Sequence, residues 1–87
     1  MAYRVFIGRK AERDLKKIPK GDQQKILLKA LKLRNNPRPL RARKTFTSRG
    51  YYRIRVGDWR IIYEVTDKIK QVSIFRIRHR REVYKNL

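Results

Sequence analysis

The spacing of hydrophobic residues predicts a strand followed by a helix at the start of the chain. In residues 2–7 large apolar side chains fall on alternate positions, as in a strand, and Gly8 breaks this pattern. In residues 9–18 the apolar positions recur at helical spacing instead, and Pro19 follows them. We therefore expect a strand over 2–7 and a helix over 9–18.

A second helix is predicted to begin near residue 22. Asp22 is of a type that favours the N-cap position, and the segment rich in Asn and Pro at 35–39 ends the helical pattern. Its broad apolar face consists of Ile26, Leu27, Ala30, Leu31 and Leu33. Because the connection to the preceding helix is short, we expect the two helices to form an antiparallel hairpin.

The second half of the chain has the two-residue period of β-strands. Residues 40–49 show no period and predict a basic loop. After it, the pattern predicts strands over 51–56, 59–65 and 71–77, with Gly57-Asp58 as a two-residue hairpin turn. Residues 80–87 are compatible with a short helix or with an extended tail.

This order of elements predicts an α+β fold. It consists of an N-terminal strand, an antiparallel two-helix hairpin and a three-strand antiparallel meander, packed as a two-layer sandwich. A chain of 87 residues has room for one modest core, so we expect a single domain over 1–87. No apolar run exceeds three residues, and the start of the chain lacks the apolar core of a signal peptide. There is no cysteine for a disulfide or a thiolate metal site, and we expect a cytoplasmic protein.

The charge of the chain indicates a polyanionic partner. Twenty-six Lys and Arg stand against seven Asp and Glu, which gives a formal net charge of +19. Such a field attracts nucleic acid, because each neutralised phosphate releases counterions. An anionic membrane surface or a merely solvated basic surface fits less well, since the basic residues run through all predicted elements and form no single stripe. An acidic protein partner is a further expectation, because a free domain of this charge would bind nucleic acids indiscriminately.

Pairing across the predicted hairpin places two arginines opposite each other. With Gly57-Asp58 as the turn, Arg55 pairs with Arg60 and Arg53 with Ile62. The face toward the helices would carry Tyr52, Ile54, Val56, Trp59, Ile61, Tyr63 and Val65, and the other face Tyr51, Arg53, Arg55, Arg60, Ile62 and Glu64. Opposed like charges destabilise a sheet. They indicate either a preorganised site that clamps a phosphate or a solvated face of a very basic protein.

The end of the last strand carries further candidate residues. His79 is the only histidine, and Arg80 and Tyr84 follow it closely. A positive field favours the neutral form of His79, which suits proton transfer, although an ordinary surface histidine is the more common case. Tyr84 could stack on a base or pack the tail against the sheet.

These segments resemble the RelE/ParE toxin superfamily of prokaryotic toxin–antitoxin systems. The resemblance is carried by RGYYRIRVGDWRIIYEV at 49–65 and IRHRREVY at 77–84, together with YRV at 3–5 and AERDL at 11–15. It covers essentially the whole chain. It implies a RelE-like fold and a cognate acidic antitoxin that covers the helix hairpin or the sheet face and displaces the C-terminal element.

The RelE branch of this superfamily cleaves mRNA in the ribosomal A site without a metal or other cofactor, through attack of a ribose 2′-OH on the next phosphodiester. Carried over by position, Arg53 and Arg55 would be its basic strand pair, Arg60 would stabilise the phosphate, Arg80 would protonate the leaving oxygen and Tyr84 would orient the base. The family's pair is often lysine, and His79 is an alternative to Arg80 as the acid. The surrounding RNA contacts are expected from Tyr51, Arg53, Arg43, Lys44, Arg49, Arg78 and Arg81.

Arginine is a poor general base, so Arg53, Arg55 and Arg60 suit charge stabilisation better than proton abstraction, and the base stays unassigned. The resemblance leaves two alternatives to a ribosome-dependent mRNA endonuclease. One is the ParE branch, which poisons DNA gyrase and generally lacks the nuclease residues. The other is a non-catalytic RNA- or ribosome-binding domain of the same shape.

Overall fold

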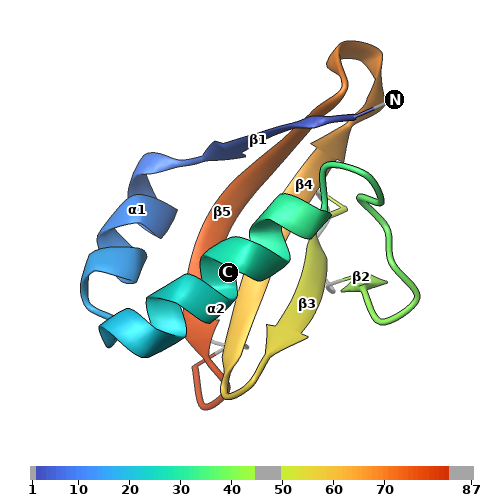
Figure 1. The fold of residues 1–87 in the computed structure, drawn as a ribbon. Coiled ribbons are helices and arrows are strands. Elements are labelled where there is room, and N and C mark those ends of the chain that lie inside the picture. The colour runs from blue at the N-terminus through green and yellow to red at the C-terminus, as the bar shows by residue number, and fades with distance from the viewer. Residues whose placement is uncertain (1, 45–49, 83–87) are drawn as a thin grey trace.

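The computed structural model describes residues 2–44 and 50–82, which form a helix layer and a sheet (Figure 1). The elements in chain order are β1 (Arg4–Ile7), α1 (Arg9–Lys16), α2 (Lys20–Lys32), β2 (Arg43–Lys44), β3 (Tyr52–Val56), β4 (Trp59–Thr66), the 3-10 turn η1 (Asp67–Ile69) and β5 (Gln71–His79). The strands lie in the order β1-β5-β4-β3-β2, with β1 parallel to β5 and all other neighbours antiparallel. The predicted α+β fold with its antiparallel meander is confirmed.

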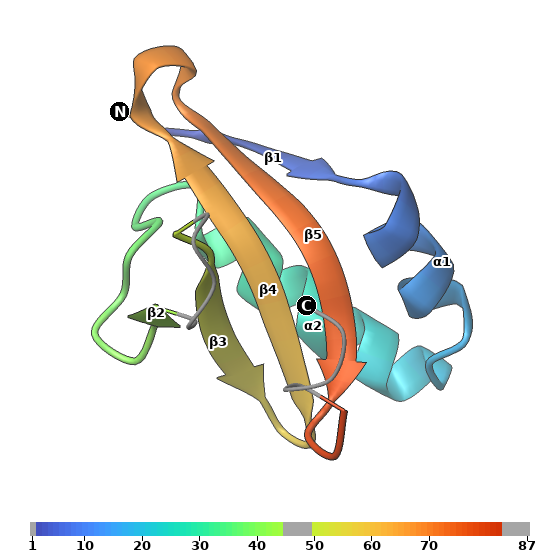
Figure 2. The same ribbon diagram turned by 180° about the vertical axis from the view of Figure 1, so that it is seen from behind.

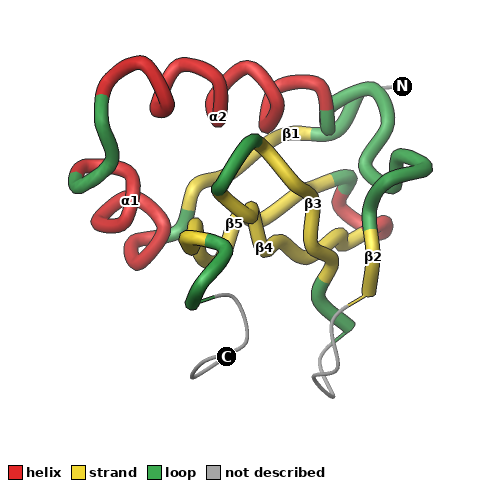
Figure 3. Tube along the Cα trace, turned by 90° about the horizontal axis from the view of Figure 1, so that it is seen from below, coloured by secondary structure: helices red, strands yellow, loops and turns green. Residues whose placement is uncertain are grey.

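The two faces of the sheet have different surroundings. Helix α2 crosses one face, and the view from behind shows the strands in front of it (Figure 2). Seen from below, α2 lies over one face of the strands and α1 lies beside them, next to β5 (Figure 3). We call the sheet face turned away from α2 the open face.

Both helices start and end at other residues than the sequence predicts. Helix α1 stops at Lys16 and not at residue 18, because the amides of Lys17 and Ile18 bond three residues back, to Asp14 and Leu15. The prediction of Asp22 as an N-cap is wrong. Helix α2 begins at Lys20 with Pro19 at the cap position, and the amide of Gln23 donates to the Pro19 carbonyl at 2.9 Å.

The hairpin register is the one that the two-residue turn predicts. Val56 pairs with Trp59, Arg55 with Arg60 and Ile54 with Ile61. The turn residue Gly57 has a φ of 60°, in the left-handed region that tight hairpin turns require and glycine adopts without strain. Part of the predicted basic loop is a strand instead, since Arg43 pairs with Arg53 and Lys44 with Tyr52.

Strand β5 contains a bulge that changes which side chains face the helices. Ile62 pairs with Arg76, whereas Tyr63 pairs with Ile74, so Phe75 is an extra residue on β5. Before the bulge Val72 and Ile74 face the core, and after it Ile77 does. A bulge re-aims side chains in this way because two residues of one strand oppose one of the other.

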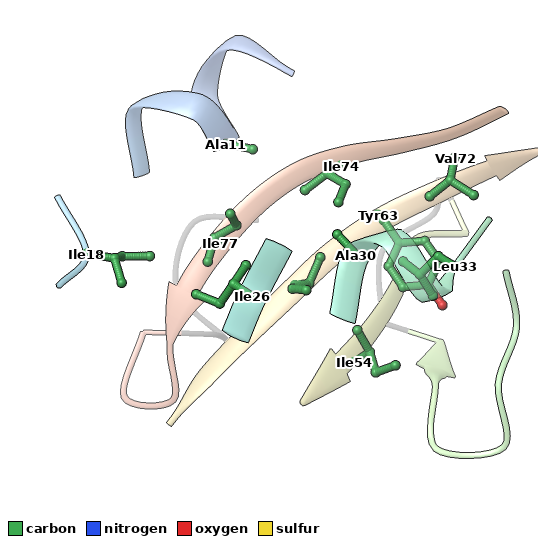
Figure 4. Close-up of a cluster of buried hydrophobic side chains, with 11 residues drawn as sticks. Ala11, Ile18, Ile26, Ala30, Leu33, Ile54, Tyr63, Val72, Ile74 and Ile77 are labelled. Carbon is green, nitrogen blue, oxygen red and sulfur yellow. The ribbon is translucent and has the colours of Figure 1, made fainter. Parts of the chain in front are cut away.

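The main core lies between α2 and the sheet (Figure 4). Its fully buried side chains include Ile26 and Leu33 of α2, Ile54 and Ile61 of the hairpin, and Tyr63. The Tyr63 hydroxyl donates to the Pro37 carbonyl at 2.7 Å, so its burial leaves no polar group unsatisfied. Burial raises the pKa of Tyr63 to about 12.

A second, smaller apolar cluster lies on the open face, which the sequence predicts to carry mainly charged side chains. Tyr51 is 7% exposed and Ile62 is fully buried, and Phe75 packs against them. The rings of Tyr51 and Phe75 stack with centroids 4.9 Å apart and an angle of 8° between their planes. The open face is therefore divided into an apolar part and a basic part.

Asp14 fastens α1 to the edge of β5 beyond the end of β1. Strand β1 pairs only with residues 71–74, and past that point α1 lies beside β5. The Asp14 carboxylate accepts the backbone N–H of Ile77 at 3.0 Å and bonds of 2.8 and 3.1 Å from the Arg76 guanidinium. It thereby satisfies backbone at an edge of β5 that no strand within residues 2–44 and 50–82 covers.

Candidate nucleic-acid interface

Arginines from three neighbouring strands lie side by side on the open face. The register pairs Arg55 of β3 with Arg60 of β4, and Arg60 with Arg78 of β5. Directly paired residues share a face, so the three side chains form one row. Arg53, two residues before Arg55, begins the next row and is paired with Arg43 of β2.

The hairpin turn orients two of these guanidinium groups. Arg60 donates through Nη1 to the carbonyls of Gly57 and Trp59, at 3.0 Å each. Arg55 donates through Nε to the same Gly57 carbonyl at 3.4 Å. Carbonyl oxygens of the turn thus hold like charges close together, although they do not neutralise them.

Arg80 joins this group through the hairpin turn. Its backbone N–H donates to the Asp58 carbonyl at 2.7 Å, which holds the chain just after β5 against the turn. Its guanidinium also lies 3.8 Å from the Asp58 carboxylate, in an ion pair in which both side chains are more than half exposed. Such an exposed pair is weak, so the guanidinium can turn toward an anion.

These side chains line an open hollow of about 610 Å³, which we call the basic pocket. It is lined by Lys29, Arg41, Arg43, Arg53, Ile54, Arg55, Gly57, Arg60 and Arg80. Seven of these nine residues are cations, and none is acidic. A concave surface with this lining concentrates a positive field and suits phosphate groups, which guanidinium groups bind with paired hydrogen bonds.

The electrostatics of Arg60 show how close the cations lie. The pKa of Arg60 is lowered, first by burial and then by the neighbouring charges of Arg55, Arg53 and Arg80. Asp58 counteracts this only in part. Like charges that are held together cost free energy in the empty pocket, and a bound phosphate would relieve that cost.

A clamp at the other end of the sheet holds the loop that leads into the pocket. Arg38 donates to both oxygens of Asp67, at 2.8 and 3.3 Å, and lies over the Tyr52 ring at 5.6 Å. The carboxylate also accepts the Tyr3 hydroxyl at 2.7 Å. Because the chain passes from this clamp directly to Arg41 and Arg43, the clamp fixes the start of the segment that supplies these two cations.

The structure brings all four predicted catalytic arginines together, but it separates His79 from them. Arg53, Arg55, Arg60 and Arg80 all line the basic pocket. His79 pairs with Trp59, whose side chain packs on the core, and its ring contacts the Trp59 ring edge-on at 5.2 Å. Its Nδ1 accepts the backbone N–H of Arg81 at 3.3 Å.

The predicted RNA contacts have different surroundings. Arg43 lines the pocket and Arg78 lies in the arginine row, whereas Lys44 and Arg81 are exposed outside the pocket. Tyr51 is buried against Phe75, so that face of its ring is not open to a base. Tyr84 and Arg49 lie outside the described residues.

Sequence reasoning missed Lys29 and Arg41 as members of the site. Lys29 belongs to α2, and only the packing of that helix next to β3 brings it to the pocket. Arg41 lies in a loop whose basic composition was visible, but no periodicity indicates where its side chain lies.

Two findings concern other kinds of site. Within residues 2–44 and 50–82, no group of three or more His, Asp or Glu side chains is arranged to hold a metal ion. None of the helices in this part of the chain is both long and apolar enough to cross a membrane.

Comparison with known proteins shows the family of the chain. The family model described as "ParE toxin of type II toxin-antitoxin system, parDE" matches residues 5–84. No curated protein matches the sequence. The solved archaeal RelE-RelB complex from Pyrococcus horikoshii contains a chain that is 32% identical, with a TM-score of 0.79, over 92% of this chain and 97% of that one.

Two further solved structures share the fold. The toxin–antitoxin complex RelBE2 from Mycobacterium tuberculosis matches with 26% identity and a TM-score of 0.82, over 91% of this chain and 99% of that one. The E. coli DinJ-YafQ toxin–antitoxin complex matches with 24% identity and a TM-score of 0.77, over 97% and 99%. With the family model covering nearly the whole length, the chain belongs to the RelE/ParE superfamily and is a toxin of a type II toxin–antitoxin system.

Proposed function

We propose that this toxin is an mRNA endonuclease that acts on the translating ribosome and thereby inhibits protein synthesis in the cytoplasm. The observation that carries the proposal is the basic pocket, in which seven cations from α2, the following loop, β2, the β3–β4 hairpin and the end of β5 converge. A protein that only needed a basic surface for solubility would spread these charges apart, because clustering them costs free energy.

The reaction is an internal transfer at phosphorus. The ribose 2′ oxygen attacks the adjacent phosphodiester, its bond to phosphorus forms while the bond to the 5′ oxygen breaks, and a 2′,3′-cyclic phosphate and a 5′-hydroxyl result. The 2′-OH loses its proton to a base that we do not assign, and the leaving oxygen takes one up.

The arginines stabilise the transition state of this reaction. Arg53, Arg55 and Arg60 donate to the phosphoryl oxygens as negative charge builds on them, and Arg80 hydrogen-bonds the leaving oxygen. Preorganised donors of this kind contribute roughly 100- to 1,000-fold each to a rate. Because their charges are already in place, they neutralise the phosphate without reorganisation.

The test is in vitro translation followed by primer extension on the mRNA. Wild-type toxin should cut the transcript, and Arg60→Ala should slow cutting roughly 100- to 1,000-fold. Arg13→Ala removes the same charge from an exposed position on α1 and serves as the matched control. Identical intact transcripts from wild type and Arg60→Ala would refute the proposal, and wild-type toxin that binds ribosomes but leaves mRNA whole would indicate a non-catalytic RNA-binding domain.

Inhibition of DNA gyrase is the second candidate, because the matching family model is that of ParE toxins. A supercoiling assay with purified gyrase separates the two functions. Loss of supercoiling without cuts in mRNA would favour the ParE-like activity, whereas cuts in mRNA with unaffected gyrase would favour the endonuclease.

A cognate antitoxin is the expected protein partner. The similar chains from Pyrococcus horikoshii and Mycobacterium tuberculosis come from complexes with an antitoxin. Helix α2 exposes Leu27, Leu28 and Leu31 between lysines, a surface that suits an amphipathic acidic segment. The toxin should co-purify with the product of a neighbouring gene, and the absence of such a complex would count against this partner.

A further inference from the structure

A second hollow, of about 270 Å³, lies on the open face near β1 and β5. We call it the aromatic hollow, since Phe6, Tyr51 and Phe75 belong to its lining, with Lys10, Glu64 and Ser73 around them. Phe6 is 57% exposed although it is a large apolar side chain. An exposed aromatic side chain at the mouth of a hollow is typical of surfaces that bind a flat ligand.

The stacked rings of Tyr51 and Phe75 form part of the wall of this hollow, and exposed Phe6 is the ring on which a flat ligand can stack. Tyr51 and Phe75 stack on each other at 4.9 Å, and the Lys10 ammonium lies over the Phe75 ring, 5.8 Å from its centre. The bulge on β5 places Phe75 on this face as its extra residue. Without that bulge the hollow would lack one of its aromatic side chains.

Glu64 is the acidic residue in the lining of the aromatic hollow. In a chain of net charge +19, Asp14, Asp58 and Asp67 each pair with an arginine. Glu64 is half-buried and forms no hydrogen bond or ion pair with any residue in 2–44 or 50–82. A carboxylate without a partner in a hollow is an acceptor for a ligand that brings N–H donors.

The aromatic hollow and the basic pocket lie along the same face of the sheet. Tyr51 lines the hollow and Arg53 the pocket, and two residues of a strand span about 7 Å. Along β4, Arg60 of the pocket and Glu64 of the hollow are separated by about 13 Å, with buried Ile62 between them. A single strand of RNA with a phosphate in the pocket can therefore extend across the open face to the hollow.

We infer that the aromatic hollow is a base-recognition subsite, in which an RNA base stacks on Phe6 and donates its amino edge to Glu64. This inference rests on the proposed endonuclease function and concerns its sequence preference. Guanine fits best, because its N1–H and its amino group are adjacent donors that match the two oxygens of one carboxylate. Uracil offers a single N–H and no amino group, so it should bind least well.

Charge favours RNA over a peptide as the occupant of this hollow. An acidic peptide would bring its carboxylates toward Glu64, and a basic peptide would be repelled by the net charge of the chain. RNA avoids both conflicts, because its phosphates meet the arginines while its uncharged bases meet Glu64.

The test measures binding by fluorescence anisotropy, in the absence of ribosomes, with short uridine-rich RNAs that carry one guanosine at each position in turn. Wild type should prefer guanosine at one position by about 10-fold over uridine, and inosine there, which lacks the amino group, should lose most of that preference. Glu64→Gln should bind all three equally. Phe6→Ala should weaken binding of every sequence by about fivefold or more.

Two matched controls accompany these variants. Glu12→Gln removes a carboxylate from the exposed side of α1, and Ile69→Ala removes a side chain that is 53% exposed, at the turn between β4 and β5. Both should keep the wild-type preference for guanosine.

The inference is wrong if Glu64→Gln keeps the preference for guanosine, or if wild type has none. It is also wrong if Phe6→Ala leaves every RNA affinity unchanged and weakens the antitoxin complex, because the hollow would then be a protein site. Since anisotropy needs neither ribosome nor cleavage, these results bear on the subsite alone. Intact transcripts in the translation assay would bear on the endonuclease proposal alone.

Discussion

Replacing Asp14 tests whether a single carboxylate holds α1 against β5. Asp14 accepts three hydrogen bonds, two from Arg76 and one from the backbone of Ile77. The Asp14 and Arg76 side chains are only 17% and 23% exposed, so solvent screens their interaction less than that of a surface pair. Asp14→Ala removes the acceptor and leaves the Ile77 N–H, on a buried part of β5, without a partner.

The cost follows from these contacts. Leaving a buried donor unpaired costs about 1–3 kcal/mol, and a hydrogen bond to a charged group contributes about 1.5–3 kcal/mol. Because the bonds share one acceptor they do not add up fully, and we expect Asp14→Ala to lower the free energy of unfolding by about 2–4 kcal/mol. For a domain of this size that corresponds to a fall in Tm of roughly 8–30 °C. Asp14→Asn, whose amide oxygen can still accept, should lose about half as much.

Urea denaturation of wild type, both Asp14 variants and Glu12→Ala measures these values. Glu12 lies on the same helix in an exposed position, and its replacement should cost at most about 1 kcal/mol through the helix dipole. Hydrogen exchange adds a local measurement, because the Ile77 amide should lose protection in Asp14→Ala and keep more of it in Asp14→Asn. Equal stability of Asp14→Ala and Glu12→Ala, with the Ile77 amide still protected, would refute this role of Asp14.

Three other predictions concern charge and ionisation. Arg55→Gln should reduce the slope of log affinity for single-stranded RNA against log salt concentration by about 0.7, the value for one lost phosphate contact, whereas removal of an exposed arginine of α1 should not. Tyr63→Phe removes the hydroxyl bonded to the Pro37 carbonyl and should cost about 1 kcal/mol in urea denaturation, and ultraviolet titration of wild type should show Tyr63 ionising near pH 12. Hydrogen bonds from Arg38, and then from Tyr3, hold the pKa of the Asp67 carboxyl below its ordinary value, so its stabilising effect should be complete above about pH 4 and disappear as pH falls through the lowered pKa. A carboxyl NMR titration should show this depressed pKa in wild type, and a return to the ordinary value in Arg38→Gln.

The chemical character of the site was visible in the sequence because it depends on local rules. A two-residue turn at Gly57-Asp58 fixes the register of its hairpin, and the register alone places Arg55 opposite Arg60. The net charge and the two-residue period of the second half required no tertiary information either. These features predicted a cluster of arginines on one face of a sheet.

The faces of β5 could not be predicted in the same way. The connection between β4 and β5 is a 3-10 turn, and the bulge at Phe75 then shifts the register by one residue. A shift of one residue moves every later side chain to the other face. After the bulge, His79 pairs with Trp59 and its ring contacts the Trp59 ring on the helix side, whereas Arg78 pairs with Arg60 on the open face.

Spacing, turn chemistry and charge are local properties, so they suffice to predict a basic α+β domain with paired arginines on a hairpin. Which other side chains join these arginines depends on how distant segments pack together. Packing of α2 brings Lys29 to the pocket, and the paths of the loop and of β5 bring Arg41 and Arg80 there. The burial of Tyr51 and the position of Glu64 also depend on contacts between residues far apart in the chain, and local sequence patterns do not predict such contacts.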